Sequence, residues 1–204
     1  MKTMLLTGAS SGIGKACFEM MSDKFDIFAP SRQEFDLEDF SSISNFNFSK
    51  YDVVVNCAGT NVGTYLGFHR NAFENQVMQV HVNFIAPVLM AKKYTQDRES
   101  GQFVYISSNS IDNPQLYNIF NSTSKLALQH TIKVLANECT NFLFTEISVG
   151  RTKTNMLHQN YNNSKSWQDI ESEYAQYKCL TADQVAQNVL YSIEHKINKI
   201  VLNP

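Results

Sequence analysis

The sequence has few cysteines, and the ones it has are scattered. Its 204 residues include four, Cys17, Cys57, Cys139 and Cys179, with no C-x-x-C pair and no histidine at the spacing of a zinc site. A chain of this length buries about 70% of the surface that it exposes when unfolded, so its core needs neither a disulfide nor a structural metal. We therefore expect reduced thiols in a cytoplasmic protein without a metal ion.

A strong excess of one charge and long apolar runs are also missing. The formal net charge is −2, so no broad electrostatic surface favours nucleic acid or anionic lipid. No apolar run approaches the roughly 20 residues that span a bilayer. The short apolar stretch at the start of the sequence does not resemble a signal peptide. These features indicate a soluble protein for which we expect neither nucleic-acid nor membrane partners.

The sequence does contain an alternation of short apolar runs with longer segments of helical period. This alternation predicts an α/β protein with a Rossmann-like, doubly wound, three-layer fold around a central parallel sheet, in a single domain of residues 1–204. Helices are predicted from Gly12 onward, at residues 70–94 with an interruption at Pro87, at residues 116–138, and after a capping box of Thr181 and Gln184. Strands are predicted at residues 3–7, 25–30, 52–56, 103–106, 142–149 and 200–202, the last as an edge strand.

Two segments depart from this alternation. Residues 31–51 are acidic and rich in serine and asparagine without an amphipathic stripe, so the crossover helix should be short or missing there. Residues 151–180 lack a clean period, hold the only tryptophan and are rich in Asn, Ser, Gln and Tyr. Long segments of this kind often form lids or binding loops. We therefore expect residues 151–180 to form a substrate loop over a site.

A glycine-rich turn separates the first predicted strand from the first predicted helix. The string TGASSGIG runs from Thr7 to Gly14. Its three glycines would let the backbone turn tightly and approach a pyrophosphate at the N-terminus of the helix. A turn without a ligand is the alternative, but the position between a strand and a helix favours the phosphate site. The residues predicted to line it are Gly8, Ser10, Ser11, Gly12, Ile13 and Gly14.

The glycine spacing G-x-x-x-G-x-G resembles that of the short-chain dehydrogenase/reductase family, and further motifs follow in the family's order. NCAG at residues 56–59 is similar to the family's NNAG. HVNF, YISS and STSK place Asn83, Ser108 and Lys125 at the positions of three members of the family's catalytic tetrad. VGRTKT places Thr154 where the family has a threonine that holds the nicotinamide carboxamide. The resemblance implies hydride transfer between a nicotinamide cofactor and a carbonyl or alcohol, and it adds Asn56, Ala58, Gly59, Lys125 and Thr154 to the expected cofactor-binding residues.

The end of the second predicted strand bears on which nicotinamide cofactor is used. In dinucleotide folds a carboxylate at this point binds the 2′-hydroxyl of the adenosine ribose, whereas an arginine neutralises a 2′-phosphate. Arg32 lies here, which favours NADP(H), and Glu34 nearby leaves NAD(H) as the alternative. An ordinary solvated loop charge is the other interpretation of Arg32. The resemblance places Asp36 and Leu37 beside the adenine ring.

The proton donor of the family is missing. The family's tyrosine stands four residues before its lysine, and here that position holds Asn121. An amide cannot act as a general acid near neutral pH, although it can donate a hydrogen bond to a carbonyl. Tyr117 is a candidate substitute, about 6 Å farther along the helix axis. The resemblance implies that Ser108 polarises the carbonyl, Lys125 contacts the nicotinamide ribose and the main chain of Asn83 holds a water. Its carbonyl would be free for that water because Pro87, four residues later, has no N–H.

Two functions from different classes follow from these motifs. The first is an oxidoreductase in which Ser108, Asn121 and Lys125 position the carbonyl, with the proton coming from water, Tyr117 or the substrate. The second is a cofactor-binding protein that has lost turnover and acts as a sensor or a partner subunit. A third interpretation is that Asn121 is an introduced change that inactivates an ordinary enzyme.

The resemblance also bears on assembly. The family usually dimerises through two long helices, which correspond here to residues 70–94 and 116–138. Symmetric dimers are the commonest oligomers of soluble proteins. We therefore expect a homodimer that acts on a small-molecule carbonyl or alcohol.

Overall fold

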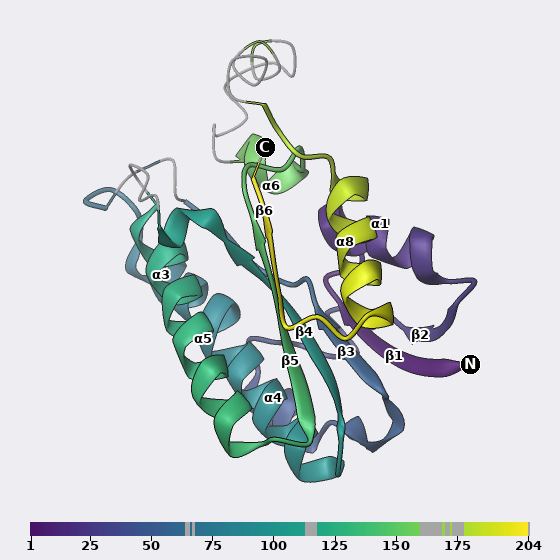
Figure 1. The fold of residues 1–204 in the computed structure, drawn as a ribbon. Coiled ribbons are helices and arrows are strands. Elements are labelled where there is room, and N and C mark those ends of the chain that lie inside the picture. The colour runs from purple at the N-terminus through teal and green to yellow at the C-terminus, as the bar shows by residue number, and fades with distance from the viewer. Residues whose placement is uncertain are drawn as a thin grey trace.

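A six-stranded parallel sheet runs through the protein, in the order β2-β1-β3-β4-β5-β6. The structure is a computed structural model that describes residues 1–63, 66, 68–112, 118–159, 169, 172 and 178–203. Figure 1 shows the sheet between two layers of helices. The strands are β1 (Lys2–Thr7), β2 (Phe25–Phe28), β3 (Val53–Asn56), β4 (Gly101–Ser108), β5 (Phe142–Val149) and β6 (Lys199–Leu202).

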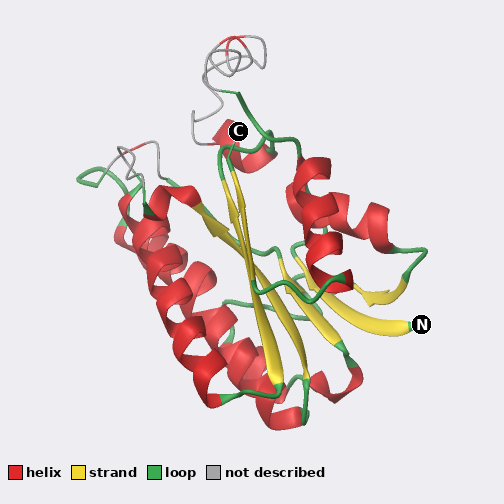
Figure 2. Cartoon of the chain, in the orientation of Figure 1, coloured by secondary structure: helices red, strands yellow, loops and turns green. Residues whose placement is uncertain are grey.

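Helices cover both faces of the sheet, as Figures 1 and 2 show. On one face lie α1 (Gly12–Met21) and α8 (Ala182–Glu194), which pack against each other. On the other face lie α3 (Phe73–Val80), α4 (Ala86–Asp97) and α5 (Ile119–Glu138). The short helices are α2 (Phe40–Asn45) and α6 (Asn155–Gln159). The predicted three-layer, doubly wound α/β fold is therefore confirmed.

The alternation of side chains along the strands divides the core in two. In β1, Met4 and Leu6 belong to the cluster that includes α1 and α8, whereas Leu5 belongs to the cluster that includes α4 and α5. Successive side chains of a strand point to opposite faces, so one apolar strand supplies both clusters. Burial of each such side chain stabilises the fold by about 1.5–3 kcal/mol relative to exposure.

The crossover between β2 and β3 is short, as the sequence predicted. It contains α2 and a single 3-10 turn, Phe48–Lys50, in place of a full covering helix. Aromatic rings do the covering instead: Phe35 and Phe46 lie 4.3 Å apart by ring centroids, and Phe46 and Phe48 lie 4.9 Å apart. β2 ends at Phe28 and not at residue 30 as predicted. Pro30 has no N–H, so it could donate no hydrogen bond to a longer ladder.

The long helical segment predicted at residues 70–94 consists of three consecutive parts. α3 leads into a π-helical turn, His81–Ile85, and α4 follows directly. The N–H of Ala86 donates to the carbonyl of His81, five residues earlier. Pro87 stands in the first turn of α4, where a missing N–H is tolerated. The predicted interruption is therefore real, and it takes the form of a wider turn just before the proline.

The ends of the predicted substrate loop meet at a small bridge. Thr152 and Leu180 pair in parallel, the N–H of Lys153 donates to the Leu180 carbonyl at 2.9 Å, and the N–H of Leu180 donates to the Arg151 carbonyl at 2.9 Å. Between them the structure describes residues 153–159, which include α6, together with residues 169, 172, 178 and 179. The rest of residues 160–177 lies outside the described part of the chain.

Three other predictions can be compared with the structure. The capping box of α8 is confirmed, because the Thr181 and Gln184 side chains each accept the other's N–H. α5 begins at Ile119, with Asn118 as its N-cap, rather than at residue 116. Within the described ranges, no helix combines the length and the apolar character that crossing a membrane requires.

Candidate functional site

The sheet has a crevice where the chain changes direction, between β1 and β3. After β1 the chain continues to β2 on one side, and after β3 it continues to β4 on the other. Ligands of doubly wound sheets bind at such a point, outside the carboxyl ends of the strands. Thr7 and Asn56, the last residues of β1 and β3, are partners in register, and the Thr7 hydroxyl donates to Asn56 Oδ1 at 2.6 Å. A cavity of about 620 Å³ opens here, which is within the usual range for ligand sites.

Glycines allow three backbone segments to meet below this cavity. Gly8 has φ +75°, and a Cβ there would lie 2.7 Å from the Ala58 nitrogen. A Cβ on Gly14 would overlap the carbonyl oxygen of Gly8. Gly12 has φ +53°, and a Cβ there would lie 3.2 Å from Thr154 Cγ2. The turn after β1 therefore has the tight geometry that the TGASSGIG string predicted.

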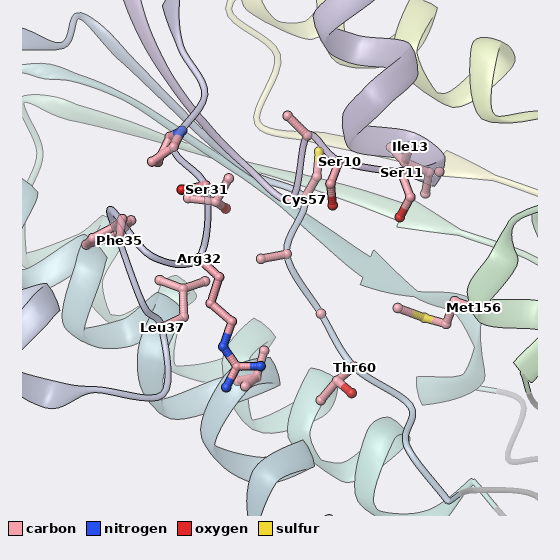
Figure 3. A pocket seen from close by; sticks show the side chains of 18 of the residues that line it. Ser10, Ser11, Ile13, Ser31, Arg32, Phe35, Leu37, Cys57, Thr60 and Met156 are labelled. Atoms are coloured by element: carbon pink, nitrogen blue, oxygen red, sulfur yellow. The ribbon is translucent and has the colours of Figure 1, made fainter.

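The N-terminus of α1 faces the cavity without a cap of its own. Its N-cap residue Ser11 makes no side-chain capping bond, and the first turn contains no acidic residue. The first amides of a helix lack partners and carry a partial positive charge, so they favour an anion. Figure 3 shows Ser10, Ser11 and Ile13 on this side of the cavity. The arrangement suits a phosphate group.

Arg32 lies on the opposite side of the same cavity (Figure 3). Its side chain is 67% exposed, with Nη2 at 2.8 Å from Glu38 Oε1 and Nε at 3.5 Å from Asp36 Oδ2. The Ser31 N–H donates to Glu34 Oε2 at 2.8 Å, which lowers the pKa of Glu34. Glu38, which the sequence reasoning missed, is thus the carboxylate closest to Arg32. Asp36 and Leu37 line the same cavity, and their place beside an adenine ring stays a prediction.

A second, inner cavity of about 180 Å³ adjoins the first, sharing part of its lining. It brings together residues that are far apart in the sequence. Ser108 comes from the end of β4, Asn121 and Lys125 come from α5, and Asn83 comes from the π-helical turn. Ala58, Gly59 and Thr154 lie at the junction of the two cavities. The predicted tetrad positions therefore face one space.

Asn83 joins two walls of the inner cavity. It is buried, its Oδ1 accepts the Thr60 N–H at 2.8 Å, and its Nδ2 donates to the Thr60 carbonyl at 2.7 Å. The same Nδ2 lies 3.3 Å from Asn121 Oδ1. The side chain of Asn83 therefore holds the segment after β3 against α5. The predicted role of its main-chain carbonyl stays a prediction.

Lys125 contributes an ammonium group to the lining of the inner cavity. The residue is 9% exposed, and its Nζ donates to the Ile106 carbonyl at 2.8 Å. Burial lowers the pKa of Lys125 to about 8, because removal from water disfavours the charged form, and the nearby Cys57 thiol opposes this shift. For Cys57 itself, a hydrogen bond with the Cys17 thiol raises the pKa, and burial raises it further.

Ser108 lines the inner cavity. Its hydroxyl lies 2.8 Å from the Ser110 hydroxyl and accepts the Ser110 N–H at 3.2 Å. It therefore also caps the 3-10 turn Asn109–Ile111. A serine hydroxyl can donate one hydrogen bond and accept two, so this capping role leaves capacity for a ligand.

Some predicted residues lie elsewhere. Asn56 and Gly14 are buried and line neither cavity, so they support the site from beneath. Tyr117 lies outside the described residues. Thr60 and Met156, which line both cavities, were missed. Thr60 directly follows NCAG, but its contact with Asn83 has no local signal in the sequence.

Comparisons with known proteins agree with this geometry. A family model described as short chain dehydrogenase matches residues 32–165. No curated protein sequence matches the chain. A short-chain dehydrogenase from Burkholderia cenocepacia in complex with NADP is similar in structure, with a TM-score of 0.82, 14% identity, and coverage of 100% of this chain and 88% of that one. A single-residue variant of actinorhodin polyketide ketoreductase with NADPH has a TM-score of 0.84, 19% identity, and coverage of 99% and 95%.

A third similar structure is a small-chain dehydrogenase in complex with NADPH. It has a TM-score of 0.80 and 21% identity, and the alignment covers 100% of this chain and 97% of that one. At identities this low, the three structures show a shared fold.

Proposed function

Because the chain belongs to the short-chain dehydrogenase family, we propose that it is an NADP(H)-dependent oxidoreductase that interconverts a carbonyl and an alcohol in a small molecule. One observation carries this proposal: the phosphate cradle at α1 and the cluster of Ser108, Asn121 and Lys125 line two cavities that join. A nicotinamide dinucleotide could place its diphosphate in one cavity and its nicotinamide in the other. When bound, it would supply or accept the hydride.

The residues of the outer cavity fit the nucleotide half of such a cofactor. The uncapped amides of α1, with Ser10, Ser11, Gly12 and Ile13, would hold the diphosphate. Gly8 and Gly14 fit this role because a Cβ on either would meet backbone atoms of the cradle. Asp36 and Leu37 would border the adenine ring, with Asn56 supporting the loop from beneath.

Arg32 supports NADP(H) over NAD(H). A guanidinium can bind a 2′-phosphate through two parallel hydrogen bonds. The Arg32 side chain now pairs with Glu38, so the phosphate would have to displace that carboxylate. An exposed ion pair is worth at most about 1 kcal/mol, so this competition is weak. NAD(H) remains the alternative ligand.

The inner cavity fits the nicotinamide end and the substrate. Ala58, Gly59 and Thr154 would lie beside the nicotinamide, and Lys125 would contact its ribose. The Ser108 hydroxyl would polarise the substrate carbonyl. The Oδ1 of Asn121 accepts a hydrogen bond from Asn83, so the amide NH₂ of Asn121 points away from Asn83. This NH₂ group can donate a hydrogen bond to the same substrate carbonyl. Residues 151–180 would form the substrate loop.

The Asn83 and Asn121 contact also favours the second candidate function. Asn121 occupies the position of the family's proton donor and is engaged in a structural hydrogen bond with Asn83. A site that binds the cofactor without delivering a proton would suit a sensor or a partner subunit of another protein. An introduced change at Asn121 would have the same consequence.

We also propose that the protein forms a homodimer through α3 and α5. Large apolar side chains are exposed on these helices, which a partner copy would cover. They are Phe73, Val77, Ile119, Leu126 and Val134.

The proposed function is tested by cofactor titration followed by a substrate panel. NADPH and NADH are titrated against the protein by fluorescence, and we expect NADPH to bind more tightly. Aldehydes, ketones and imines are then screened for NADPH oxidation with the wild type and with Asn121→Tyr. Turnover by the wild type supports the oxidoreductase, and turnover by Asn121→Tyr alone supports the cofactor-binding alternative. Failure of both cofactors to bind would overturn both functions.

A further inference from the structure

The inner cavity contains few groups that could give a proton to a substrate. Its described lining residues include three with a titratable side chain: Cys57, Lys125 and Arg151. An arginine keeps its proton at any physiological pH. A hydrogen bond with Cys17 and burial both raise the pKa of Cys57, so its thiol is a poor acid near neutral pH. Among the described lining residues, Lys125 is left as the group that can give up a proton near neutral pH.

The position of Lys125 suits this role. Its Nζ lies 3.8 Å from the point where a Cβ on Gly59 would stand, at the junction of the two cavities. One of its three N–H groups is used on the Ile106 carbonyl at 2.8 Å, and an ammonium can direct the other two toward a ribose and a substrate. Lys125 is also one helical turn after Asn121, on the same face of α5.

Because Asn121 replaces a tyrosine, a substrate has more room to approach the Nζ of Lys125. An amide side chain is much shorter than a phenol, and the Asn121 amide is held toward Asn83. A substrate oxygen or a bridging water can therefore approach Nζ more closely than a tyrosine would allow. We propose that Lys125 is the general acid of this protein and donates its Nζ proton to the substrate oxygen in place of the missing tyrosine. This inference rests on the proposed function.

The step balances in atoms and electrons. The carbonyl carbon gains the hydride that NADPH supplies, so the carbonyl is reduced by two electrons and the cofactor is oxidised. The substrate oxygen gains a proton as an N–H bond of Lys125 breaks and an O–H bond forms. Lys125 is left as a neutral amine, and it recovers a proton from solvent through the cleft. In alcohol oxidation the neutral amine accepts the proton, and Lys125 is the general base.

The electrostatic surroundings make the ammonium a stronger acid than an exposed lysine. Burial lowers the pKa of Lys125 to about 8. The titratable groups that line the same cavity are Cys57, from the segment after β3, and Arg151, from the segment after β5. Asn83 and Asn121 also line it and are neutral. The buried Glu146 of β5 is engaged by Gln129 and by Lys199 at 3.2 Å. A catalytic acid works best when its pKa lies near the working pH.

The first experiment measures the proton affinity of Lys125 without turnover. The protein is labelled with ¹³C at the lysine ε-carbons, and the resonances are followed by NMR against pH, with and without NADPH. The Lys125→Gln variant assigns the signal. We expect the Lys125 signal to titrate near pH 8. A Lys125 signal that titrates near the ordinary lysine value of 10.5 would overturn the proposal.

The second experiment compares the same substitution in two backgrounds. Lys125→Arg keeps the positive charge but cannot release a proton, so we expect NADPH affinity to stay within about threefold and kcat to fall by about 10²-fold or more. In the Asn121→Tyr background the tyrosine supplies the proton, and the same substitution should cost far less. Lys133→Arg, on the exposed side of α5, is the matched control and should change neither value.

The outcomes separate this inference from the proposed function. For the wild type, kcat for carbonyl reduction should fall as pH rises through the pKa of Lys125, and kcat for alcohol oxidation should rise. If Lys125→Arg lowers kcat equally in the wild-type and Asn121→Tyr backgrounds, Lys125 positions the cofactor and is not the acid. A loss of turnover in Tyr117→Phe, with Lys125→Arg active, would identify Tyr117 as the acid instead. If only Asn121→Tyr turns over, Lys125 is not the acid but the cofactor site stands.

Discussion

At the scale of single residues, two positive charges of the site lie in different surroundings: one is buried in the inner cavity, and the other is exposed and paired with carboxylates. The charged end of Lys125 is buried, and its Nζ donates to the Ile106 carbonyl. Arg32 lies at the exposed end of the cleft, among carboxylates. Burial of the Lys125 charge therefore lowers the free energy of unfolding, whereas the exposed Arg32 charge has little effect on it.

The cost of burying Lys125 predicts how stability changes with pH. The pKa falls from 10.5 in the unfolded chain to about 8 in the folded protein. Between pH 8 and pH 10.5 the unfolded chain binds more protons than the folded protein, so the free energy of unfolding rises with pH. Below pH 8 the buried charge lowers the free energy of unfolding by its full amount, roughly 3 kcal/mol. We expect Lys125→Met to raise the free energy of unfolding at pH 7 by about 1–3 kcal/mol and to remove this rise.

Urea denaturation of the cofactor-free protein at several pH values measures both effects. Lys133→Met is the control, because Lys133 is exposed on the same helix. A Lys125→Met protein that is less stable at pH 7, with an unchanged dependence on pH, would contradict the expectation.

The ion pair of Arg32 predicts how cofactor preference can be changed. Arg32→Gln should weaken NADPH binding by about ten- to a hundredfold, since hydrogen bonds to charged groups are worth about 1.5–3 kcal/mol. NADH binding should hardly change. Glu38→Gln removes the competing carboxylate at 2.8 Å, so it should tighten NADPH binding.

Fluorescence titration with both cofactors checks these changes in affinity. Lys15→Gln, an exposed residue of α1 that pairs with Glu19, is the matched control. Equal effects of Arg32→Gln on the two cofactors would mean that Arg32 is an ordinary solvated loop charge.

At the scale of elements, the segment after β5 is fixed at its base. Main-chain hydrogen bonds join Arg151 and Lys153 to Leu180, and Leu180 directly precedes the capping box of α8. Thr154 belongs to the base and not to the remainder of the segment, and its Cγ2 would lie 3.2 Å from a Cβ on Gly12. The base can therefore keep its geometry when the sequence beyond it is changed.

We expect residues 160–177 to affect substrate binding but not the stability of the fold. Replacing them by a short Gly/Ser linker should change the free energy of unfolding by less than about 1 kcal/mol, because loop length contributes only logarithmically. NADPH affinity should be retained, whereas KM for a carbonyl substrate should rise at least tenfold. Denaturation, titration and steady-state kinetics give the three values. An unchanged KM would exclude this segment as the substrate loop.

At the scale of the whole molecule, two of the most exposed apolar side chains among the described residues lie together on α3. Phe73 is 82% exposed and Val77 is 67% exposed, one turn apart on α3. The near-neutral net charge of −2 puts little long-range repulsion between two copies. Both features are what a symmetric dimer interface on this face needs.

Placing two lysines on α3 should separate the proposed dimer. We expect Phe73→Lys combined with Val77→Lys to raise the dimer dissociation constant at least a hundredfold, because central interface residues are worth about 2 kcal/mol or more. Sedimentation velocity measures the change. Phe40→Lys is the control, since Phe40 is also an exposed aromatic residue, 61% exposed, but lies on α2. A wild type that sediments as a monomer at tens of micromolar would contradict the dimer.

The sequence by itself determined the elements and the glycine turn. Strand patterns such as VVV at residues 53–55 and the capping box of α8 act over a few residues, so they can be recognised locally. The same holds for the positive φ of Gly8 and Gly12 and for the four-residue step from Asn121 to Lys125. The family resemblance then supplied the expected roles of these residues.

The tertiary structure alone decided which side chains meet. The contact of Asn83 with Asn121 joins elements 38 positions apart, and it depends on the packing of the π-helical turn against α5. The pairing of Arg32 with Glu38 depends on how the short crossover folds back. The lowered pKa of Lys125 arises from its burial where the segments after β3, β4 and β5 meet, because desolvation is a property of the assembled site and no local pattern of residues encodes it.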